Sequence, residues 1–308
     1  MTTASYSQLI EKTLRLLTPT QLEQQLQITT DYVAGSGTLV LDSAAAALNA
    51  VRPGTILANN LNLFYVTQVV SNTISVVGGY QGSTDVNQAH GATAASTVVV
   101  RPKFSRFDIS IAINDEIDSL SAPDNGIGQI LNADITWVPV FMGYALPASF
   151  DSATSYILEL QAKQVDPMRR FPLIRKGDYR TIRNQTDPAF PSGCGVIIYN
   201  TKGDPGQPVH VQYLAPFSRL VSPNDDALTV AGIPQSAQDI VPMGAALRLA
   251  PPREIQRNTT GAQPDPRKTS EVPPNAIQAS ANALNALYMR RIGQERSRIV
   301  RSFPQAER

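Results

Sequence analysis

The stretch Asn275–Val300, NAIQASANALNALYMRRIGQERSRIV, carries the strongest helical signal in the sequence. Apolar side chains recur along it every three or four positions, at Ile277, Ala281, Leu284, Tyr288 and Ile292. This is the period of one face of an α-helix. Pro273 and Pro274 precede the stretch, and Asn275 is a suitable N-cap. We therefore expect a long amphipathic helix over residues 275–300.

Three further segments are predicted to be helical, at 5–17, 105–121 and 240–250. Residues 105–121 also show strand-like alternation, but isoleucines keep helical spacing there for three turns. Ser105 with Asp108 forms a capping-box-like start. Asp239 can cap the third segment, which we expect to end at Pro251-Pro252 because proline breaks helix interiors.

Two β-rich regions lie between these helices. Residues 27–100 carry only four charged side chains, and short runs of β-branched residues alternate there with turn signals. Residues 131–230, punctuated by proline and glycine, are predicted to form a second β domain. We expect the only tryptophan, Trp137, to anchor its core.

Together these elements predict an α+β fold with a helical bundle core, built from four helices distant in sequence, and two β-rich insertions. The predicted parts are residues 1–26 (first part of the helical core), 27–103 (β-rich insertion), 104–130 (second part of the core), 131–235 (β-sandwich-like domain) and 236–308 (third part of the core, with the long C-terminal helix).

The composition argues against several classes of protein. The net charge is +1, from 26 basic and 25 acidic residues, so bulk charge does not draw the chain to nucleic acid. The single cysteine, Cys194, excludes an intramolecular disulfide and a multi-cysteine zinc site. We find no signal peptide and no apolar stretch near the ~18 residues of a membrane span, and expect a protein made in the cytoplasm. Charged residues are only 17% of the chain, which suits surfaces that contact other copies.

Candidates for catalysis or metal binding are weak. Neither His90 nor His210 accompanies a nucleophile motif, and Cys194 lacks an identifiable partner, so we interpret all three as structural. The carboxylates within residues 115–118 lack the glycine turn of a calcium loop. No P-loop or dinucleotide-binding fingerprint is present. We therefore expect no enzyme activity, no cofactor and no metal.

The arginine-rich C-terminal end is the one unusual charged feature. Residues 286–308 contain six arginines, two glutamates and no lysine. Arginine makes bidentate pairs with carboxylates and phosphates. The end could bind a phosphate backbone, remain a solvated tail, or dock on an acidic partner or a neighbouring subunit. We favour docking because the apolar stripe of the helix runs directly into the arginines.

Several stretches, taken in order, resemble the head-to-tail adaptor (connector) proteins of tailed bacteriophages. They are Val76–Gly79, Gly82–Thr84, Ala89–Ala92, Val99–Phe104, Ile113–Ile117, Val211–Phe217, Gly232–Ile240, Gly244–Leu249, Glu271–Pro274 and Tyr288–Glu295. The set covers most of the chain. One departure is visible: the family's β-turn carries an arginine before its glycine, where this chain has Val77-Gly78-Gly79.

The resemblance implies a fold and a role. The helices would form a bundle, and copies would assemble into a dodecameric ring between the portal protein and a stopper or tail terminator. Genomic DNA would pass through the lumen, in the neck of the virion, without sequence-specific contact. The C-terminal helix would dock into the portal through Arg290, Arg291, Arg296, Arg298, Arg301 and Phe303. As a hypothesis, Asp108, Asp115 and Asp118 line the lumen or meet arginines of a neighbouring subunit.

Two alternatives stay open. Another ring-forming tail or neck protein, such as a tail terminator, tail tube or baseplate component, would also use β modules. It would not be expected to carry the long basic C-terminal helix. A carbohydrate-binding or hydrolytic tail accessory would need an aromatic-lined pocket, and aromatics make up only 6% of the chain.

Overall fold

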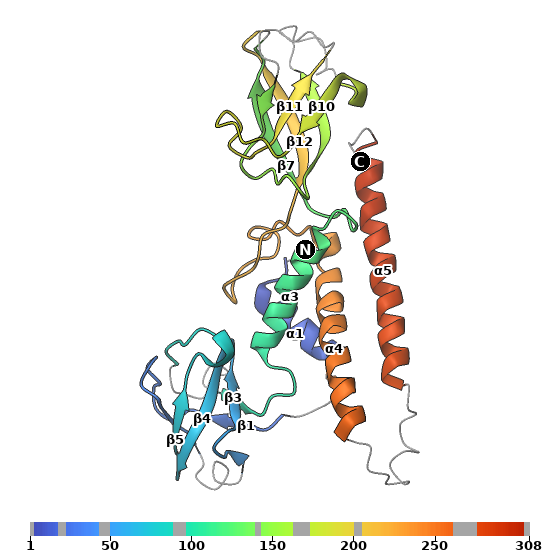
Figure 1. Cartoon of the computed structure of the whole chain (residues 1–308). Helices are drawn as coiled ribbons and strands as arrows, with labels where there is room; N and C mark the ends of the chain where they lie inside the picture. The colour runs from blue at the N-terminus through green and yellow to red at the C-terminus, as the bar shows by residue number, and fades with distance from the viewer. Residues whose placement is uncertain are drawn as a thin grey trace. The chain divides into compact units, whose positions relative to one another are not determined.

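The computed structural model describes residues 3–17, 23–42, 50–88, 97–138, 143–162, 173–199, 205–260 and 276–304 (Figure 1). The chain divides into two compact units. Unit 1 contains Met1–Gln8, Asn114–Gly244 and Asp265–Arg308, and unit 2 contains Leu9–Ile113 and Ala245–Pro264. Three helices have residues in both units: α1 (Tyr6–Leu17), α3 (Arg106–Leu120) and α4 (Ile240–Thr260).

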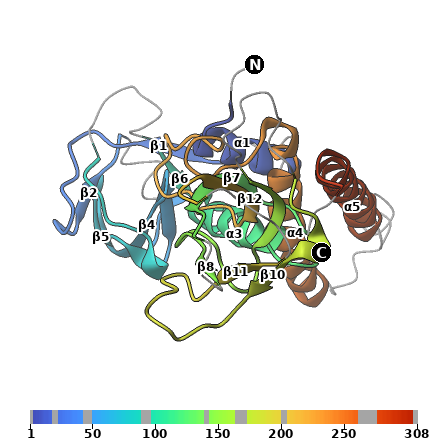
Figure 2. The ribbon, with the colours of Figure 1, turned by 90° about the horizontal axis from the view of Figure 1, so that it is seen from above.

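Unit 2 contains a six-stranded antiparallel sheet in the order β1-β6-β3-β4-β5-β2. Its strands are β1 (Gln25–Gln27), β2 (Thr38–Val40), β3 (Ile56–Asn59), β4 (Asn62–Val70), β5 (Thr73–Val77) and β6 (Thr97–Val100). The sheet curls into a half-barrel. Just beyond its two edge strands, Ile28 pairs with Leu41, and the Thr29 amide donates to the Val40 carbonyl at 2.9 Å. Figure 2 shows β2, β5 and β4 side by side.

The concave side of this sheet is filled by aliphatic and aromatic side chains. Leu39, Leu57 and Ile74 are at most 1% exposed. The rings of Tyr32 and Phe64 meet edge to face with centroids 5.0 Å apart, an arrangement that aromatic quadrupoles favour. The alternation of apolar residues along the strands therefore directs one face of each strand into a shared core.

The turn at Val77-Gly78-Gly79, which departs from the adaptor pattern, packs against the side chain of Asp85. The Asp85 carboxylate accepts hydrogen bonds from the Tyr32 hydroxyl (3.0 Å), the Gly35 amide (2.8 Å) and the Asn62 side-chain amide (3.3 Å). A Cβ at Gly78 would lie 2.3 Å from Asp85 Oδ1. Glycine at this position thus makes room for the carboxylate that ties the loop together.

Unit 1 contains two three-stranded antiparallel sheets. One has the order β7-β12-β9 and the other β10-β11-β8. The strands are β7 (Gln129–Thr136), β8 (Tyr144–Ala145), β9 (Tyr156–Ala162), β10 (Tyr179–Ile182), β11 (Gly195–Ile198) and β12 (Pro208–Ala215). Both sheets contribute to one hydrophobic cluster, in which Trp137 is 8% exposed and stacks on Tyr144 with ring centroids 5.9 Å apart. The expectation that Trp137 anchors this core is confirmed.

The fourth long helix, α5 (Ala276–Ser302), lies in unit 1. Three short 3₁₀ helices complete the described elements: η1 (Tyr80–Gly82), η3 (Lys176–Asp178) and η4 (Gln235–Ala237). All four predicted helices exist. The predicted end of α4 is wrong, because the helix continues through Pro251-Pro252 to Thr260. A proline removes one backbone donor and costs a few kcal/mol, a penalty that the longer helix here tolerates.

The predicted fold class is wrong. The described chain is mostly β-sheet, a six-stranded half-barrel plus two three-stranded sheets, with four α-helices and no helical bundle core. The helical bundle that the adaptor resemblance implied is therefore wrong as well. The physical reason is visible in α5, where Ile299 packs on Leu158 of β9 and Leu214 of β12. Helical spacing identifies an apolar face but does not identify what covers it.

Most of the strands predicted from runs of β-branched and aromatic residues are present. The runs expected at 38–41, 55–57, 64–70, 74–77, 97–100, 155–159, 196–199 and 209–214 correspond to β2, β3, β4, β5, β6, β9, β11 and β12. The run expected at 135–142 is misplaced, because β7 ends at Thr136. Strands β1, β8 and β10 were missed. His90, Asn275, Arg308 and the motif Glu271–Pro274 lie outside the described residues.

Candidate functional site

Helix α5 buries one face within unit 1. Ile292, Glu295 and Ile299 are 6%, 4% and 2% exposed, and Tyr288 is partly buried. These positions follow one another at intervals of three or four, so they form a single stripe along the helix. The predicted apolar stripe therefore continues to Ile299, although a glutamate takes part in it.

A polar cluster fixes the middle of α5 to the start of α4. The Arg291 guanidinium donates to both Asp239 oxygens, at 2.7 and 2.9 Å, and to the Ser236 carbonyl at 2.7 Å. The hydrogen bond to Asp239 raises the pKa of Arg291 and keeps it charged. Glu295 accepts from the Ser236 hydroxyl at 3.0 Å and from Arg298 Nε at 2.8 Å. Charge-assisted bonds of this kind are stronger than neutral ones, so this side of the helix is firmly held.

Two further contacts hold α5. The Tyr288 hydroxyl donates to Glu116 of α3 at 2.6 Å, and Glu116 is only 1% exposed. Its carboxyl group occupies the space above Gly244 of α4, where a Cβ would lie 2.1 Å from the carboxyl carbon. At the other end of α5, Phe303 packs beside Ile299 on the outer side of strands β9 and β12.

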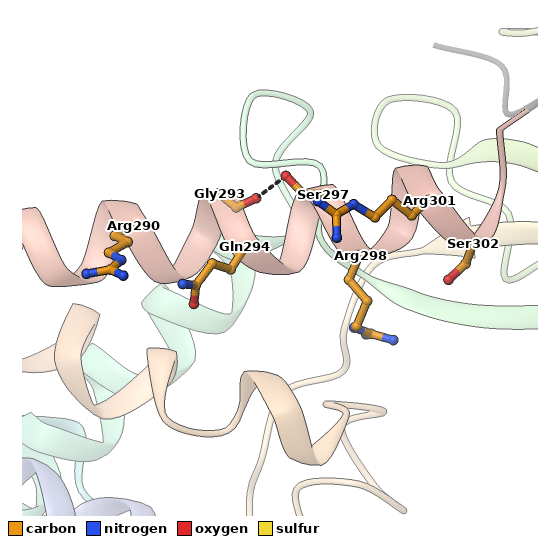
Figure 3. Close-up of a pocket in the computed structure, with 7 residues that line it drawn as sticks. All are labelled: Arg290, Gly293, Gln294, Ser297, Arg298, Arg301 and Ser302. Atoms are coloured by element: carbon orange, nitrogen blue, oxygen red, sulfur yellow. Dashed lines mark hydrogen bonds between the residues drawn. The ribbon is translucent and has the colours of Figure 1, made fainter.

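The opposite side of α5 is exposed and carries arginine. We call Leu287, Arg290, Gln294, Ser297 and Arg301 the outward stripe; their spacing places them on the side of the helix away from Glu295. A shallow hollow of about 560 Å³ lies along it, lined also by Gly293, Arg298 and Ser302 (Figure 3). The figure shows Arg290, Gln294 and Arg298 extending from one side of the helix.

The two arginines of the outward stripe have no acidic partner among the described residues, whereas Arg291 and Arg298 do. Arg290 and Arg301 are 11 positions apart, which is roughly 16 Å along an α-helix. Leu287 and Met289, close to Arg290 in the helix, are 48% and 56% exposed. Two exposed guanidinium groups on a helix that other contacts hold can recognise carboxylates or phosphates on a partner.

The structure thus separates the six residues predicted to dock. Arg291 and Phe303 face inward and hold α5 in place. Arg298 lies at the rim of the hollow, paired with Glu295. Arg296 is exposed and makes a long 3.4 Å bond to the Asp124 carbonyl. Only Arg290 and Arg301 lie on the outward stripe.

The three predicted aspartates have different surroundings. Asp108 completes the expected cap of α3, because its amide donates to Ser105 Oγ at 2.9 Å and its carboxylate accepts from the same hydroxyl at 2.6 Å. Asp118 pairs with Arg219, whose Nε lies 3.0 Å away, and this bond raises the pKa of Arg219. Asp115 is exposed.

Sequence reasoning missed the anchoring residues Glu295, Ser236 and Glu116. Glu295 had a usable signal, since it takes a place between Ile292 and Ile299 at helical spacing. Asp239 was expected only as a helix cap, and its pairing with Arg291 was not foreseen. The partners of such buried polar groups come from distant parts of the chain, so local patterns cannot identify them.

The residues considered for chemistry have structural surroundings. Cys194 is fully buried in the core of unit 1, and burial raises its pKa. His210 of β12 pairs with Asp134 on the neighbouring strand β7. Among the described residues, no group of three or more His, Cys, Asp or Glu side chains could hold a metal ion. Nor does any described helix have the length and apolarity to cross a membrane.

Comparison with known proteins adds no assignment, because no protein-family model matches the chain and no curated protein matches it.

Proposed function

We propose that this chain is a structural virion protein, a head-to-tail adaptor of a tailed bacteriophage. Its copies form a ring, a dodecamer by the resemblance, between the portal protein and a stopper or tail terminator. Genomic DNA passes through the lumen without sequence-specific contact. The protein is made in the host cytoplasm, acts in the neck of the virion, and has no enzyme activity and no membrane contact.

The observation that carries this proposal is the two-sided construction of α5. Its inner stripe is fixed by Arg291, Tyr288 and Ile299. Its outward stripe presents Arg290 and Arg301 without acidic partners in the described chain. A helix that is held rigidly and displays unpaired arginines is suited to docking on another protein, since little conformational entropy is lost on binding.

The sequence adds two supports. The ordered set of adaptor-like stretches runs through most of the chain, and charged residues are sparse, as in surfaces that become buried in assemblies. The proposal does not include the helical bundle that the resemblance implied. It rests on the stretches themselves and on α5.

A second candidate is favoured by the β-rich construction. A tail terminator, tail tube or baseplate protein would also use β modules such as the half-barrel of unit 2. Such a protein would form rings or tubes without binding a portal. The long arginine-bearing α5 favours the adaptor, because the alternative was not expected to carry it.

The test is binding to purified portal rings. Wild-type chain is mixed with portal, and the mass of the complex is measured by native mass spectrometry. A variant with two accessible α5 arginines neutralised, Arg296→Gln and Arg301→Gln, should lose portal binding, and it leaves the bond between Arg298 and Glu295 in place. The matched control neutralises two exposed arginines elsewhere, at Arg15 and Arg180, and should bind as wild type does.

The outcomes separate the two candidates. Portal binding that depends on the α5 arginines supports the adaptor. Self-assembly into tubes, with no portal binding by any variant, favours the tail-tube candidate. Equal loss of portal binding in both two-arginine variants would mean that overall charge, and not α5, carries the interaction.

A further inference from the structure

The outward stripe of α5 has a complement on the same chain. Asp115 of α3 is exposed and lies within the electrostatic reach of Arg219, but neither Asp115 nor Arg290 makes an ion pair at contact distance among the described residues. Its neighbour Asp118, one turn along the same helix, is already paired with Arg219. Both aspartates and all of α5 belong to unit 1. Within this unit, opposite charges are therefore exposed on two helices, and each can form a contact-distance ion pair with another copy.

We propose that Arg290 of one copy pairs with Asp115 of the next copy, so that α5 docks on α3 of its neighbour. This inference rests on the proposed ring and names the contact between its subunits. It assigns Arg290 to that contact, while the other accessible arginines of α5 remain available to the portal.

Charge and rigidity both favour a second copy of the chain as the partner of Arg290. An arginine displays several donors in a planar fork, and a carboxylate is a planar acceptor that matches it. Arg290 extends from a helix that is held by the Arg291–Asp239 pair and by the Tyr288–Glu116 bond, and Asp115 extends from the helix that carries Glu116. Both groups are thus presented on fixed supports, which makes the pairing specific.

The proposed contact joins two different surfaces of neighbouring copies. One surface of a copy, α5, meets a different surface of the next copy, α3, so the interface is heterologous. A heterologous interface generates a ring if the rotation between copies closes, and a filament if it does not. DNA is the other class of partner for exposed arginines, but its phosphates offer no complement to the Asp115 carboxylate.

The experiment is a charge swap between copies. The variants Arg290→Glu and Asp115→Arg each place like charges at every contact. Because like charges across an interface are strongly disfavoured, each variant alone should need at least about tenfold more protein to assemble. In an equimolar mixture, each contact can join opposite charges by alternating the two variants. The mixture should therefore assemble as wild type does. The double variant, with Arg290→Glu and Asp115→Arg in one chain, has opposite charges at every contact and should also assemble.

Matched controls keep the same charge changes elsewhere. Arg180→Glu lies on an exposed position of β10, and Asp42→Arg on an exposed position after β2. Each should assemble as wild type does, and circular dichroism should show every variant folded. Assembly is followed without portal or DNA, by mass photometry across a concentration series.

The outcomes distinguish this inference from the proposed function. Rescue by mixing supports the Arg290–Asp115 contact. Normal rings from Arg290→Glu alone, combined with lost portal binding, would overturn the contact and leave the adaptor proposal standing. In a separate series with added DNA, loss of DNA binding by Arg290→Glu, with its assembly unchanged, would assign Arg290 to nucleic acid and overturn the contact. If wild-type chain forms no ring, with or without portal, both proposals fail.

Discussion

Replacing Gly244 with alanine tests the packing that holds α3, α4 and α5 together in unit 1. A Cβ at this position would lie 2.1 Å from the carboxyl carbon of Glu116. Glu116 is 1% exposed and accepts the Tyr288 hydroxyl at 2.6 Å. The carboxyl group must therefore move by more than an ångström, within a space that has little room.

Three contributions set the expected magnitude. Overpacking of a closed site costs about 1–3 kcal/mol. Losing a hydrogen bond to a charged group costs about 1.5–3 kcal/mol. Replacing glycine by alanine inside a helix returns about 1 kcal/mol. We therefore expect Gly244→Ala to lower the free energy of unfolding of unit 1 by about 1.5–5 kcal/mol.

The matched control is Gly293, a second helical glycine, in α5. Gly293 is exposed, and a Cβ there would have no atom within 4 Å. Gly293→Ala should therefore stabilise by about 0.5–1 kcal/mol, the gain in helix propensity alone. The same substitution thus has opposite signs at two helical positions, for a reason that only the surroundings supply.

The assay is urea unfolding followed by circular dichroism, with a double-mutant cycle. In a Glu116→Ala background the carboxyl group is absent, so the added cost of Gly244→Ala should vanish and the helix-propensity gain should appear. If Gly244→Ala stabilises the wild-type chain as much as Gly293→Ala does, or if its cost is unchanged in the Glu116→Ala background, the reasoning is wrong.

Three other predictions follow from the described contacts. Arg291→Ala removes both bonds to Asp239 and should cost about 1–3 kcal/mol in urea unfolding; an unchanged midpoint would contradict the anchoring role. Burial and the hydrogen bond to Asp85 raise the pKa of Tyr32 from 10.0 to about 12, so its contribution to stability is complete below pH 10 and is lost as pH rises to 12. Tyr32→Phe should flatten the stability curve over that range, and a wild-type-like slope would refute this. Cys194 is fully buried and burial raises its pKa, so a thiol reagent should react with it only after urea unfolds the protein; fast reaction of the native chain would count against its burial.

The helices were predictable because their signal is local. The cap of α3 by Ser105 and Asp108, and the stripe through Tyr288 and Ile292, are readable from neighbouring residues. Runs of β-branched and aromatic residues identified most strands for the same reason. Strand β1, Gln-Leu-Gln, and strand β8, two residues long, have little such signal and are recognised only by their pairing with β6 and β11.

The fold class was not predictable in this way. The apolar stripe of α5 was expected to meet other helices, yet Ile299 packs on Leu158 and Leu214 of a sheet. An amphipathic face is equally satisfied by a helix or by a sheet, because burial of apolar surface is non-directional. Whether a helix or a sheet covers the apolar face depends on the packing of the whole chain.

In the candidate site, too, some features depend on neighbouring residues and others on tertiary contacts. The sequence by itself determined that the C-terminal end carries arginine on an amphipathic helix, since charge and periodicity are properties of consecutive residues. Only the tertiary structure decided which arginines are available. Arg291 is held by Asp239, which is 52 residues earlier, while Arg290, its immediate neighbour, is exposed. Adjacent side chains on a helix differ by about 100° in direction, so the packing of one face decides which of two neighbours is left for a partner.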